Sequence, residues 1–302
     1  MIRKMHDTME TPYAHRTWQS ADGLTLHFRD YPGPEDARDL PPVLCLHGLT
    51  RNARDFASLA LHLGARRRVI VPEMRGRGRS DYAPDSSTYS PATYVADVEA
   101  LLAQETIDAF ISIGTSMGGL MTMMIAAADA AAGRQRIVGA VLNDIGPDLD
   151  PAGIDKIRGY LGQGRSYPTW MHAARALKET HDDAHPDFEI EDWLDMAKRT
   201  LVAGQSGRLV YDYDMAIAEP FNQAPANAAP PDLWPAFDAL GEIPLLLVRG
   251  ELSNLLTTET AERMAQRHAN MELVTVKRCG HAPMLDEPEV LAAIDRLLEK
   301  TT

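Results

Sequence analysis

The feature of this sequence that says most about its fold is a short glycine-rich turn between two apolar segments. Residues 109–113 form an apolar run typical of a buried strand, and residues 117–131 carry the pattern of a helix. The turn between them reads Gly114-Thr115-Ser116-Met117-Gly118. Small neighbours leave room for a serine on so sharp a turn, which lifts its Oγ above the sheet. The turn therefore predicts a reactive Ser116 at the edge of a sheet.

Similar apolar runs alternate with helical patterns along most of the chain, which is typical of an α/β protein with a mainly parallel sheet. The predicted strands are residues 24–28, 43–46, 69–71, 109–113, 138–142, 245–248 and 273–276. The predicted helices are residues 53–63, 93–103, 117–131, 258–268 and 288–298.

The alternation stops after Pro147, where strand signals disappear for almost ninety residues. A loop of that length without structure of its own would be unusual in a compact domain. We therefore expect a small helical insertion at residues 148–235 that covers the mouth of the sheet, with residues 222–231 as its return linker. Residues 1–147 and 236–302 would then form the core.

Composition and charge exclude several classes of protein. The 302 residues are 45% hydrophobic, which suits one large domain or a core with an insertion. A formal net charge of −13 without a basic stripe argues against nucleic acid as a partner. Cys45 and Cys279 form no disulfide framework, no apolar window is long enough to span a membrane, and residues 1–12 lack the apolar core of a signal peptide. We expect a cytoplasmic protein that contacts no membrane.

Reactive groups follow several of the predicted strands, at the edge where open parallel sheets bind their ligands. The strand at 43–46 runs into His47-Gly48-Leu49. There the N–H of Leu49 is placed to bind an oxyanion together with the N–H of Met117. A plain glycine turn is the alternative interpretation of this segment.

A histidine follows the last predicted strand, on a glycine-bearing loop that reads Gly280-His281-Ala282. With the nucleophile first in the chain and the histidine last, His281 suits a general base toward Ser116 and then a general acid toward the leaving group. His47 competes for this role, but its place beside Gly48 favours bracing of the oxyanion loop.

These motifs together resemble the α/β-hydrolase family of the capped type, over nearly the whole chain. The resemblance is carried by His47-Gly48, by the arginine-glycine run at 75–81, by the turn at 114–118 and by Gly280-His281. It implies an eight-stranded, mostly parallel sheet flanked by helices, with a helical cap at 148–235. The arginine-glycine run is expected to shape a loop beside the site.

The resemblance also implies the roles of four residues. Ser116 would be the nucleophile and His281 the base. Leu49 and Met117 would supply the two oxyanion-binding N–H groups.

The acid of the triad departs from the family pattern. The family often places it in a segment R-G-x-x-S-D after the penultimate strand, and this chain has Asn254 where the aspartate is expected. An amide can hold an imidazole but cannot stabilise the imidazolium with a negative charge. Asp144 resembles the acid position of some haloalkane dehalogenases, although it could equally be a structural residue at the entry to the cap. The alternatives to Asp144 are a carboxylate that reaches in from Glu251 and an inactivating substitution at Asn254.

The expected reaction is acyl transfer to water through an acyl-serine intermediate. We predict a small or medium hydrophobic ester or lactone as the substrate. Carbon–carbon bond hydrolysis of ring-cleavage products is the enzymatic alternative, and a non-catalytic binding protein or inactivated hydrolase is the alternative of another class. No dinucleotide fingerprint and no metal-ligand spacing occur, so no cofactor or metal is expected. Whether the chain is a monomer or a homodimer stays open.

Substrate choice is expected to depend on the inserted segment, whose large apolar side chains are candidate walls of an apolar pocket with few polar anchors. The candidates are Tyr160, Trp170, Met171, Trp193, Tyr211, Tyr213 and Phe221. About one in three is expected to touch the substrate, because most such residues form the core of the segment itself.

Overall fold

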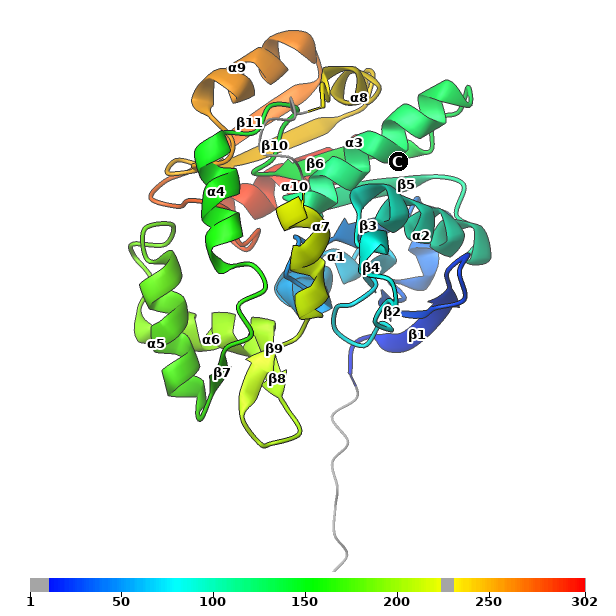
Figure 1. The fold of residues 1–302 in the computed structure, drawn as a ribbon. Coiled ribbons are helices and arrows are strands. Elements are labelled where there is room, and N and C mark those ends of the chain that lie inside the picture. The colour runs from blue at the N-terminus through cyan, green and yellow to red at the C-terminus, as the bar shows by residue number, and fades with distance from the viewer. Residues whose placement is uncertain (1–10, 224–230, 302) are drawn as a thin grey trace, which may run out of the picture.

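The fold is an open α/β sheet covered by helices on both faces, as the sequence pattern predicts (Figure 1). The computed structural model describes residues 11–223 and 231–301. In these residues, eight strands form the large sheet, in the order β1-β2-β4-β3-β5-β6-β10-β11. The strands are β1 (Ala14–Gln19), β2 (Thr25–Tyr31), β3 (Val43–Leu46), β4 (Val69–Glu73), β5 (Phe110–Thr115), β6 (Ile137–Asn143), β10 (Leu245–Gly250) and β11 (Met271–Val276).

The sheet is mostly parallel, with an antiparallel edge. β2 pairs antiparallel with both β1 and β4, and the pairs from β4 to β11 are parallel. The sequence pattern missed β1, because its side chains are exposed except for Trp18 and they form no apolar run. An edge strand of this kind carries a weak apolar signal.

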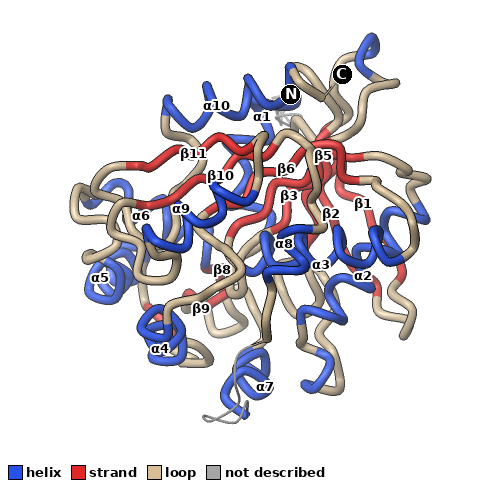
Figure 2. The backbone as a smooth tube through the Cα atoms, turned by 90° about the horizontal axis from the view of Figure 1, so that it is seen from above, coloured by secondary structure: helices blue, strands red, loops and turns tan. Residues whose placement is uncertain are grey.

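Helices cover the two faces unequally, as Figure 2 shows. One face carries α1 (Ala57–Gly64) and α10 (Pro288–Glu299). The other carries α2 (Pro91–Gln104), α3 (Met117–Ala131), α8 (Trp234–Asp238) and α9 (Thr258–Arg267).

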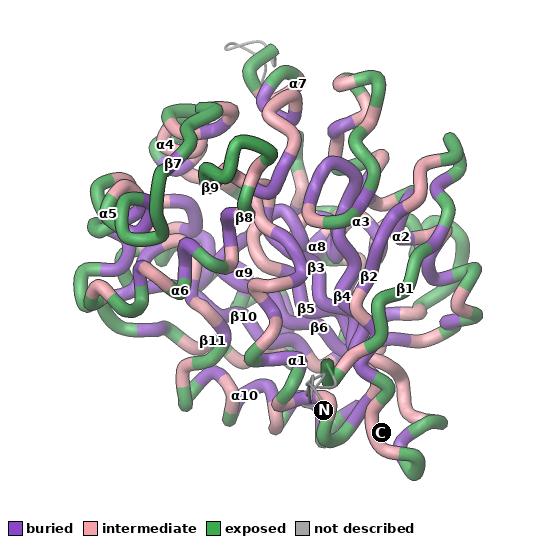
Figure 3. The backbone as a smooth tube through the Cα atoms, turned by 90° about the horizontal axis from the view of Figure 1, so that it is seen from below, coloured by how far each residue is buried: buried purple, intermediate pink, exposed green. Residues whose placement is uncertain are grey.

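The central strands are buried (Figure 3). Their side chains alternate between two apolar cores. In β3, Val43 and Cys45 pack in the core beneath α1 and α10, whereas Leu44 and Leu46 pack in the core beneath α2 and α3. This period of two is the geometry of a pleated strand with both faces covered. Because the strands from β4 to β11 are parallel, their carboxyl ends meet at one edge of the sheet, where the loops that follow them form the site.

The segment inserted between β6 and β10 has its own small core, built around the buried side chain of Trp193. Its described elements are α4 (Pro151–Tyr160), β7 (Ser166–Tyr167), α5 (Trp170–His181), α6 (Ile190–Thr200), β8 (Leu201–Ala203), β9 (Leu209–Tyr211) and α7 (Ala218–Gln223). Figure 1 shows β7, β9 and β8 as a separate small sheet beside α5 and α6.

The sequence pattern predicts a helical insertion, but the segment is not helical throughout, because β7, β8 and β9 pair with one another beside its helices. Strands of two or three residues are too short to show a period of two. α8 begins at Trp234, close to the expected end of the insertion at 235, and packs against α3 of the core. The expected return linker at 222–231 falls mostly on residues 224–230, which lie outside the described residues. Among the described helices, none is both long and apolar enough to cross a membrane.

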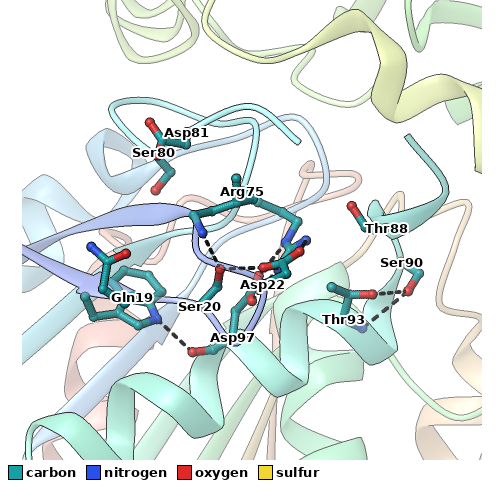
Figure 4. Close-up of polar contacts among 12 residues, drawn as sticks. Gln19, Ser20, Asp22, Arg75, Ser80, Asp81, Thr88, Ser90, Thr93 and Asp97 are labelled. Carbon is teal, nitrogen blue, oxygen red and sulfur yellow. Dashed lines mark hydrogen bonds and ion pairs between the residues drawn. The ribbon is translucent and has the colours of Figure 1, made fainter. Parts of the chain in front are cut away.

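The loop after β4, which contains the arginine-glycine run, is anchored by a buried arginine (Figure 4). The Arg75 guanidinium donates to both carboxylate oxygens of Asp97 on α2, at 2.8 and 2.7 Å, and to those of Asp22, at 2.7 and 3.0 Å. These bonds to Arg75 lower the pKa of Asp22 to about 2. The loop is thereby tied to α2 and to the turn between β1 and β2, as the structural interpretation of this run predicts.

The two outer glycines of the serine turn are required by close packing. A Cβ on Gly118 would lie 2.0 Å from the carbonyl oxygen of Leu46, and one on Gly114 would lie 2.4 Å from the backbone of Gly118. Contacts this short cannot be relieved without moving β3, β5 or α3. The glycine pattern therefore reflects how closely the helix start approaches the strands.

We expect Gly118→Ala to lower the free energy of unfolding by about 3 kcal/mol, because the added methyl group overpacks a rigid backbone contact. Gly159→Ala is the matched control, since a Cβ on Gly159 in helix α4 meets nothing within 4 Å. That control should stabilise the protein by about 0.5–1 kcal/mol through helix propensity. Urea unfolding followed by circular dichroism measures both changes. Equal stability of the two variants would show that the packing at Gly118 is not tight.

Candidate active site

Ser116 occupies the sharp turn between β5 and α3. Its backbone has φ 52° and ψ −116°, a region that non-glycine residues rarely adopt. The turn is held by the N–H of Ser116, which donates to the carbonyl of Asn143 at 3.0 Å, and by its carbonyl, which accepts from the N–H of Gly119 at 2.8 Å. The strain is therefore supported from both the neighbouring strand β6 and the first turn of the helix.

His281 lies on the loop after β11 and meets the serine side chain. Its Nε2 is 2.9 Å from Ser116 Oγ. The inserted segment helps to hold this loop, because the N–H of Gly280 donates to the carbonyl of Ala184 at 2.6 Å. Residues that are 165 positions apart in the sequence are thus within hydrogen-bond distance.

Asp144 completes a chain of three hydrogen-bonded side chains. The Nδ1–H of His281 donates to Asp144 Oδ2 at 2.7 Å. The Asp144 carboxylate is fully buried and also accepts from the N–H of Gly250 at 2.8 Å and from the hydroxyl of Ser253 at 2.6 Å. With Nδ1 carrying the proton, Nε2 is the acceptor that faces the Ser116 hydroxyl.

Of the three residues considered for the acid position, the structure brings Asp144 to the imidazole. Asn254 follows β10 and lines the cavity described below, but no hydrogen bond joins its side chain to His281 in the described parts of the chain. Glu251 is exposed and accepts from the backbone N–H of Arg278 at 2.7 Å. Because β6 and β10 are adjacent, the loop after β10 supplies Asp144 with donors instead of supplying an acid of its own.

Ser253 and Gly250 are site residues that the sequence pattern did not identify. Both belong to the segment Arg249-Gly250-Glu251-Leu252-Ser253-Asn254, where the family pattern places an acid. The serine was a usable signal, since a hydroxyl one position before the missing aspartate can still donate to a carboxylate. The serine can be recognised as a donor only when its acceptor is known, and that acceptor, Asp144, lies 109 positions away in the sequence.

The loop after β3 lies directly against the serine. A Cβ on Gly48 would be 3.8 Å from the Cβ of Ser116, an ordinary van der Waals distance, so the two loops are in contact at this point. Within residues 11–223 and 231–301, the N–H groups of Leu49 and Met117 donate no hydrogen bond to the protein. Met117 is the first residue of α3, so its N–H is one of the groups that a helix start leaves unpaired. Two unpaired donors therefore lie near Ser116: the N–H of Met117 follows it in the chain, and the N–H of Leu49 belongs to the loop that lies against it.

His47 braces this loop and does not reach the serine. Its Nδ1–H donates to the carbonyl of Gly48 at 2.8 Å, and its Nε2 accepts from the N–H of Met74 at 3.1 Å. The fully buried Arg77 holds the same loop, because its Nε donates to the carbonyl of Leu49 at 3.0 Å. The guanidinium of Arg77 also lies over the ring of Tyr94, 4.6 Å from its centroid.

Burial, together with the charge of Arg77, lowers the pKa of His47 to about 4. An unfolded histidine titrates near 6.5, so between pH 6.5 and 4 the unfolded chain binds a proton that the folded chain does not. The free energy of unfolding must therefore fall as the pH falls through this window. We expect His47 to contribute up to about 3 kcal/mol to that loss.

Urea unfolding of the wild-type protein and His47→Gln at pH 7 and pH 4.5 measures this contribution. Glutamine cannot take up the proton, so the variant should lose less stability over the interval than the wild type, although it is less stable at pH 7. Other histidines contribute equally to both proteins. Equal losses in the two proteins would mean that His47 is not held neutral by the fold.

Ser116 and His281 lie in a cavity of about 280 Å³ between the sheet edge and the inserted segment. Three of the predicted wall residues line it: Tyr160, Tyr211 and Tyr213. The other four do not: Trp193 is buried in the core of the inserted segment, Phe221 packs against the core of the sheet, and Trp170 and Met171 are exposed.

The cavity is more polar than the predicted apolar pocket. Four charged side chains line it beside the apolar ones: Arg51, Asp55, Lys156 and Arg165. The sequence pattern does not reveal them, because they come from the loop after β3 and from the inserted segment. No strand-end motif marks either position.

Comparisons with known proteins give consistent matches over most of the chain. A model of the alpha/beta hydrolase family matches residues 43–294. The 3-hydroxybutyrate-oligomer hydrolase of Cupriavidus necator is 33% identical over 273 residues, which cover 88% of this chain and 91% of that protein. An esterase of Mycobacterium tuberculosis is 25% identical over 264 residues, covering 85% of this chain and 82% of that protein. The crystal structure of an alpha/beta hydrolase from Novosphingobium aromaticivorans is 58% identical, with a TM-score of 0.90 over 96% of this chain and 99% of that one.

Proposed function

Because this chain belongs to the alpha/beta hydrolase family and is a hydrolase, we propose that it cleaves carboxylic esters through an acyl-serine intermediate on Ser116. The observation that supports this most strongly is the hydrogen-bonded chain from Ser116 Oγ through His281 to Asp144. A serine hydroxyl is a weak nucleophile unless a positioned base removes its proton. This arrangement supplies that base and orients it.

In the proposed mechanism, Ser116 Oγ attacks the ester carbonyl carbon and His281 Nε2 takes its proton. The N–H groups of Leu49 and Met117 stabilise the oxyanion that forms. The intermediate then expels the alcohol, which receives the proton from His281. Water attacks the acyl-serine by the same route and releases the acid. Throughout, the negative charge of Asp144 stabilises the imidazolium and holds Nδ1 protonated.

We propose that residues 148–235 act as a cap over this reaction. Side chains of this segment, including Tyr160 and Tyr211, line the cavity together with Ser116. A covering segment excludes water from the reacting groups and sets the size of the substrate. A cavity of about 280 Å³ suits a short acyl chain.

For the substrate, we propose a short ester of a hydroxy acid. The Cupriavidus necator relative is named for the hydrolysis of 3-hydroxybutyrate oligomers, and it matches this chain over most of both lengths. A lactone contains the same bond closed into a ring and belongs to the same class. A small molecule of this kind can enter a cavity of about 280 Å³, whereas the surface of a polymer particle cannot.

An ester screen tests the proposal. The purified protein is assayed with nitrophenyl acetate, butyrate and octanoate, with the 3-hydroxybutyrate dimer, and with a diketone of the ring-cleavage type. We expect saturable hydrolysis of the dimer and of the two short nitrophenyl esters, with the octanoate turned over more slowly because the cavity limits chain length. Hydrolysis of the diketone without hydrolysis of any ester would replace the proposal with carbon–carbon bond cleavage. Inertness toward every compound would favour a binding protein.

A further inference from the structure

The cavity around Ser116 carries more positive than negative charge. Three basic side chains line it, Arg51, Lys156 and Arg165, which we call the basic cluster. Asp55 is the one carboxylate among the lining residues that the structure describes. The chain as a whole has a formal net charge of −13. A positive cavity in an acidic protein concentrates anions at the site and repels cations.

Arg51 is the member of the basic cluster that lies beside the serine. Its Cγ would be 3.4 Å from a Cβ on Gly48, and that same Cβ would be 3.8 Å from the Cβ of Ser116. The Nε and Nη2 of Arg51 donate to the two carboxylate oxygens of Asp55, at 2.5 and 2.7 Å. Its Nη1 has no hydrogen-bond partner within the described part of the protein, which leaves one guanidinium nitrogen for a ligand.

The other two members come from the inserted segment and are weakly engaged. Lys156 on α4 pairs with Asp183 at 2.6 Å, but the side chain of Asp183 is 65% exposed. An ion pair with so exposed a partner contributes little and can exchange for a ligand. Arg165, between α4 and β7, is exposed and makes no ion pair or side-chain hydrogen bond with residues 11–223 or 231–301. Both cations therefore line the cavity from the inserted segment, where a ligand can reach them.

Other titratable groups of the cavity do not offset this charge. Burial, together with the charges of Arg51 and Lys156, lowers the pKa of His181 to about 4. His185 behaves in the same way, with a pKa lowered to about 4. Burial also raises the pKa of Tyr160 to about 12, so its hydroxyl stays protonated and can donate a hydrogen bond. His181, His185 and Tyr160 therefore add no charge to the lining at neutral pH, and Asp55 is the one carboxylate that faces the basic cluster among the described lining residues.

We propose that the ester cleaved at Ser116 carries a free carboxylate, which the basic cluster holds while the ester carbonyl lies against the nucleophile. Guanidinium and ammonium groups bind a carboxylate through short charge-assisted hydrogen bonds, and a partly enclosed cavity strengthens them. The carboxylate is a binding handle and takes no part in the bond changes. This inference rests on the proposed ester hydrolysis and makes anionic esters the preferred substrates of that reaction.

Two matched pairs of substrates test it. In the first pair, 3-acetoxybutyrate is compared with 3-acetoxybutyramide, which differs in the charge of the acid end and has the same single ester. In the second, monoethyl succinate is compared with ethyl succinamate, which moves the charge to the acyl side. We expect kcat/KM to favour the acid over the amide by about ten-fold in at least one pair. This preference should weaken as the salt concentration rises.

Variants of the basic cluster show whether these residues cause the preference. In the double variant Lys156→Gln with Arg165→Gln, the ratio of kcat/KM for the acid to kcat/KM for the amide should fall from about ten to a value between about 1 and 3. The matched control is Arg175→Gln with Lys178→Gln, which also removes one arginine and one lysine charge, but from exposed positions of α5 outside the cavity. The control should keep the wild-type ratio. Thermal unfolding checks that both double variants are folded.

The outcomes separate this inference from the proposed function. Hydrolysis of acid and amide at equal rates in both pairs, or an unchanged ratio in the basic-cluster variant, would overturn the carboxylate handle while leaving ester hydrolysis intact. Failure of the wild-type protein to cleave any of the four esters or any ester of the screen above would overturn the proposed function and the inference with it.

Discussion

Replacing Ser116 with alanine lowers kcat for ester hydrolysis by on the order of a million-fold. The variant lacks the oxygen that would form the acyl intermediate, so water must attack the substrate directly. His281 and Asp144 remain, and so do the backbone N–H groups beside them, so a residual rate above that of water alone should persist. Release of nitrophenol from the butyrate ester under single-turnover conditions measures the loss.

Ser58→Ala is the matched control for this variant. Ser58 is an exposed serine on α1 and does not line the cavity. Its replacement should leave kcat unchanged. If the Ser116 variant kept about one hundredth of the wild-type rate or more, the chemistry would belong to another group.

Replacing Asp144 with asparagine lowers kcat by about ten-thousand-fold, with little change in KM. The carboxylate accepts three hydrogen bonds, from His281, Gly250 and Ser253. An amide would have to turn its NH₂ group toward one of these donors, and it offers no negative charge to the imidazolium. When the NH₂ group faces Nδ1, the imidazole is held in the wrong tautomer, and its Nε2 can no longer accept the serine proton. Steady-state kinetics with the butyrate ester measures both constants.

Asn254→Asp is the informative partner of this variant. The side chain of Asn254 makes no hydrogen bond to His281 in the described residues, so a new carboxylate there should change kcat by less than about ten-fold. Circular dichroism verifies that each protein is folded. Full activity in Asp144→Asn, together with a gain of orders of magnitude in Asn254→Asp, would show that Asp144 is not the acid.

The fold was largely predictable from local sequence patterns, because seven of its strands are apolar runs and the main helices carry a clear period. What escaped prediction shares a physical cause. β1 exposes nearly all of its side chains, and β7, β8 and β9 are two or three residues long. Elements of this kind are held by pairing with distant segments, so their own residues carry little signal.

The site was predictable to the extent that single motifs define it. The turn at Ser116 and the loop of His281 each carry their own glycines, and the structure brings these two side chains to 2.9 Å. The choice between Asp144 and Asn254 could not be made from the sequence, because it depends on the adjacency of β6 and β10. The charged lining of the cavity also escaped prediction, because its residues converge from a core loop and the inserted segment, and neither segment carries a motif that marks them.

Mass spectrometry after reaction with a fluorophosphonate tests the role of the serine most directly. We expect a single adduct on Ser116 in the wild-type protein, slower formation of that adduct in Asp144→Asn, and none in Ser116→Ala. A wild-type protein that stays unlabelled at Ser116, or that is modified as fast at a different residue, would contradict the assignment of this serine as the nucleophile.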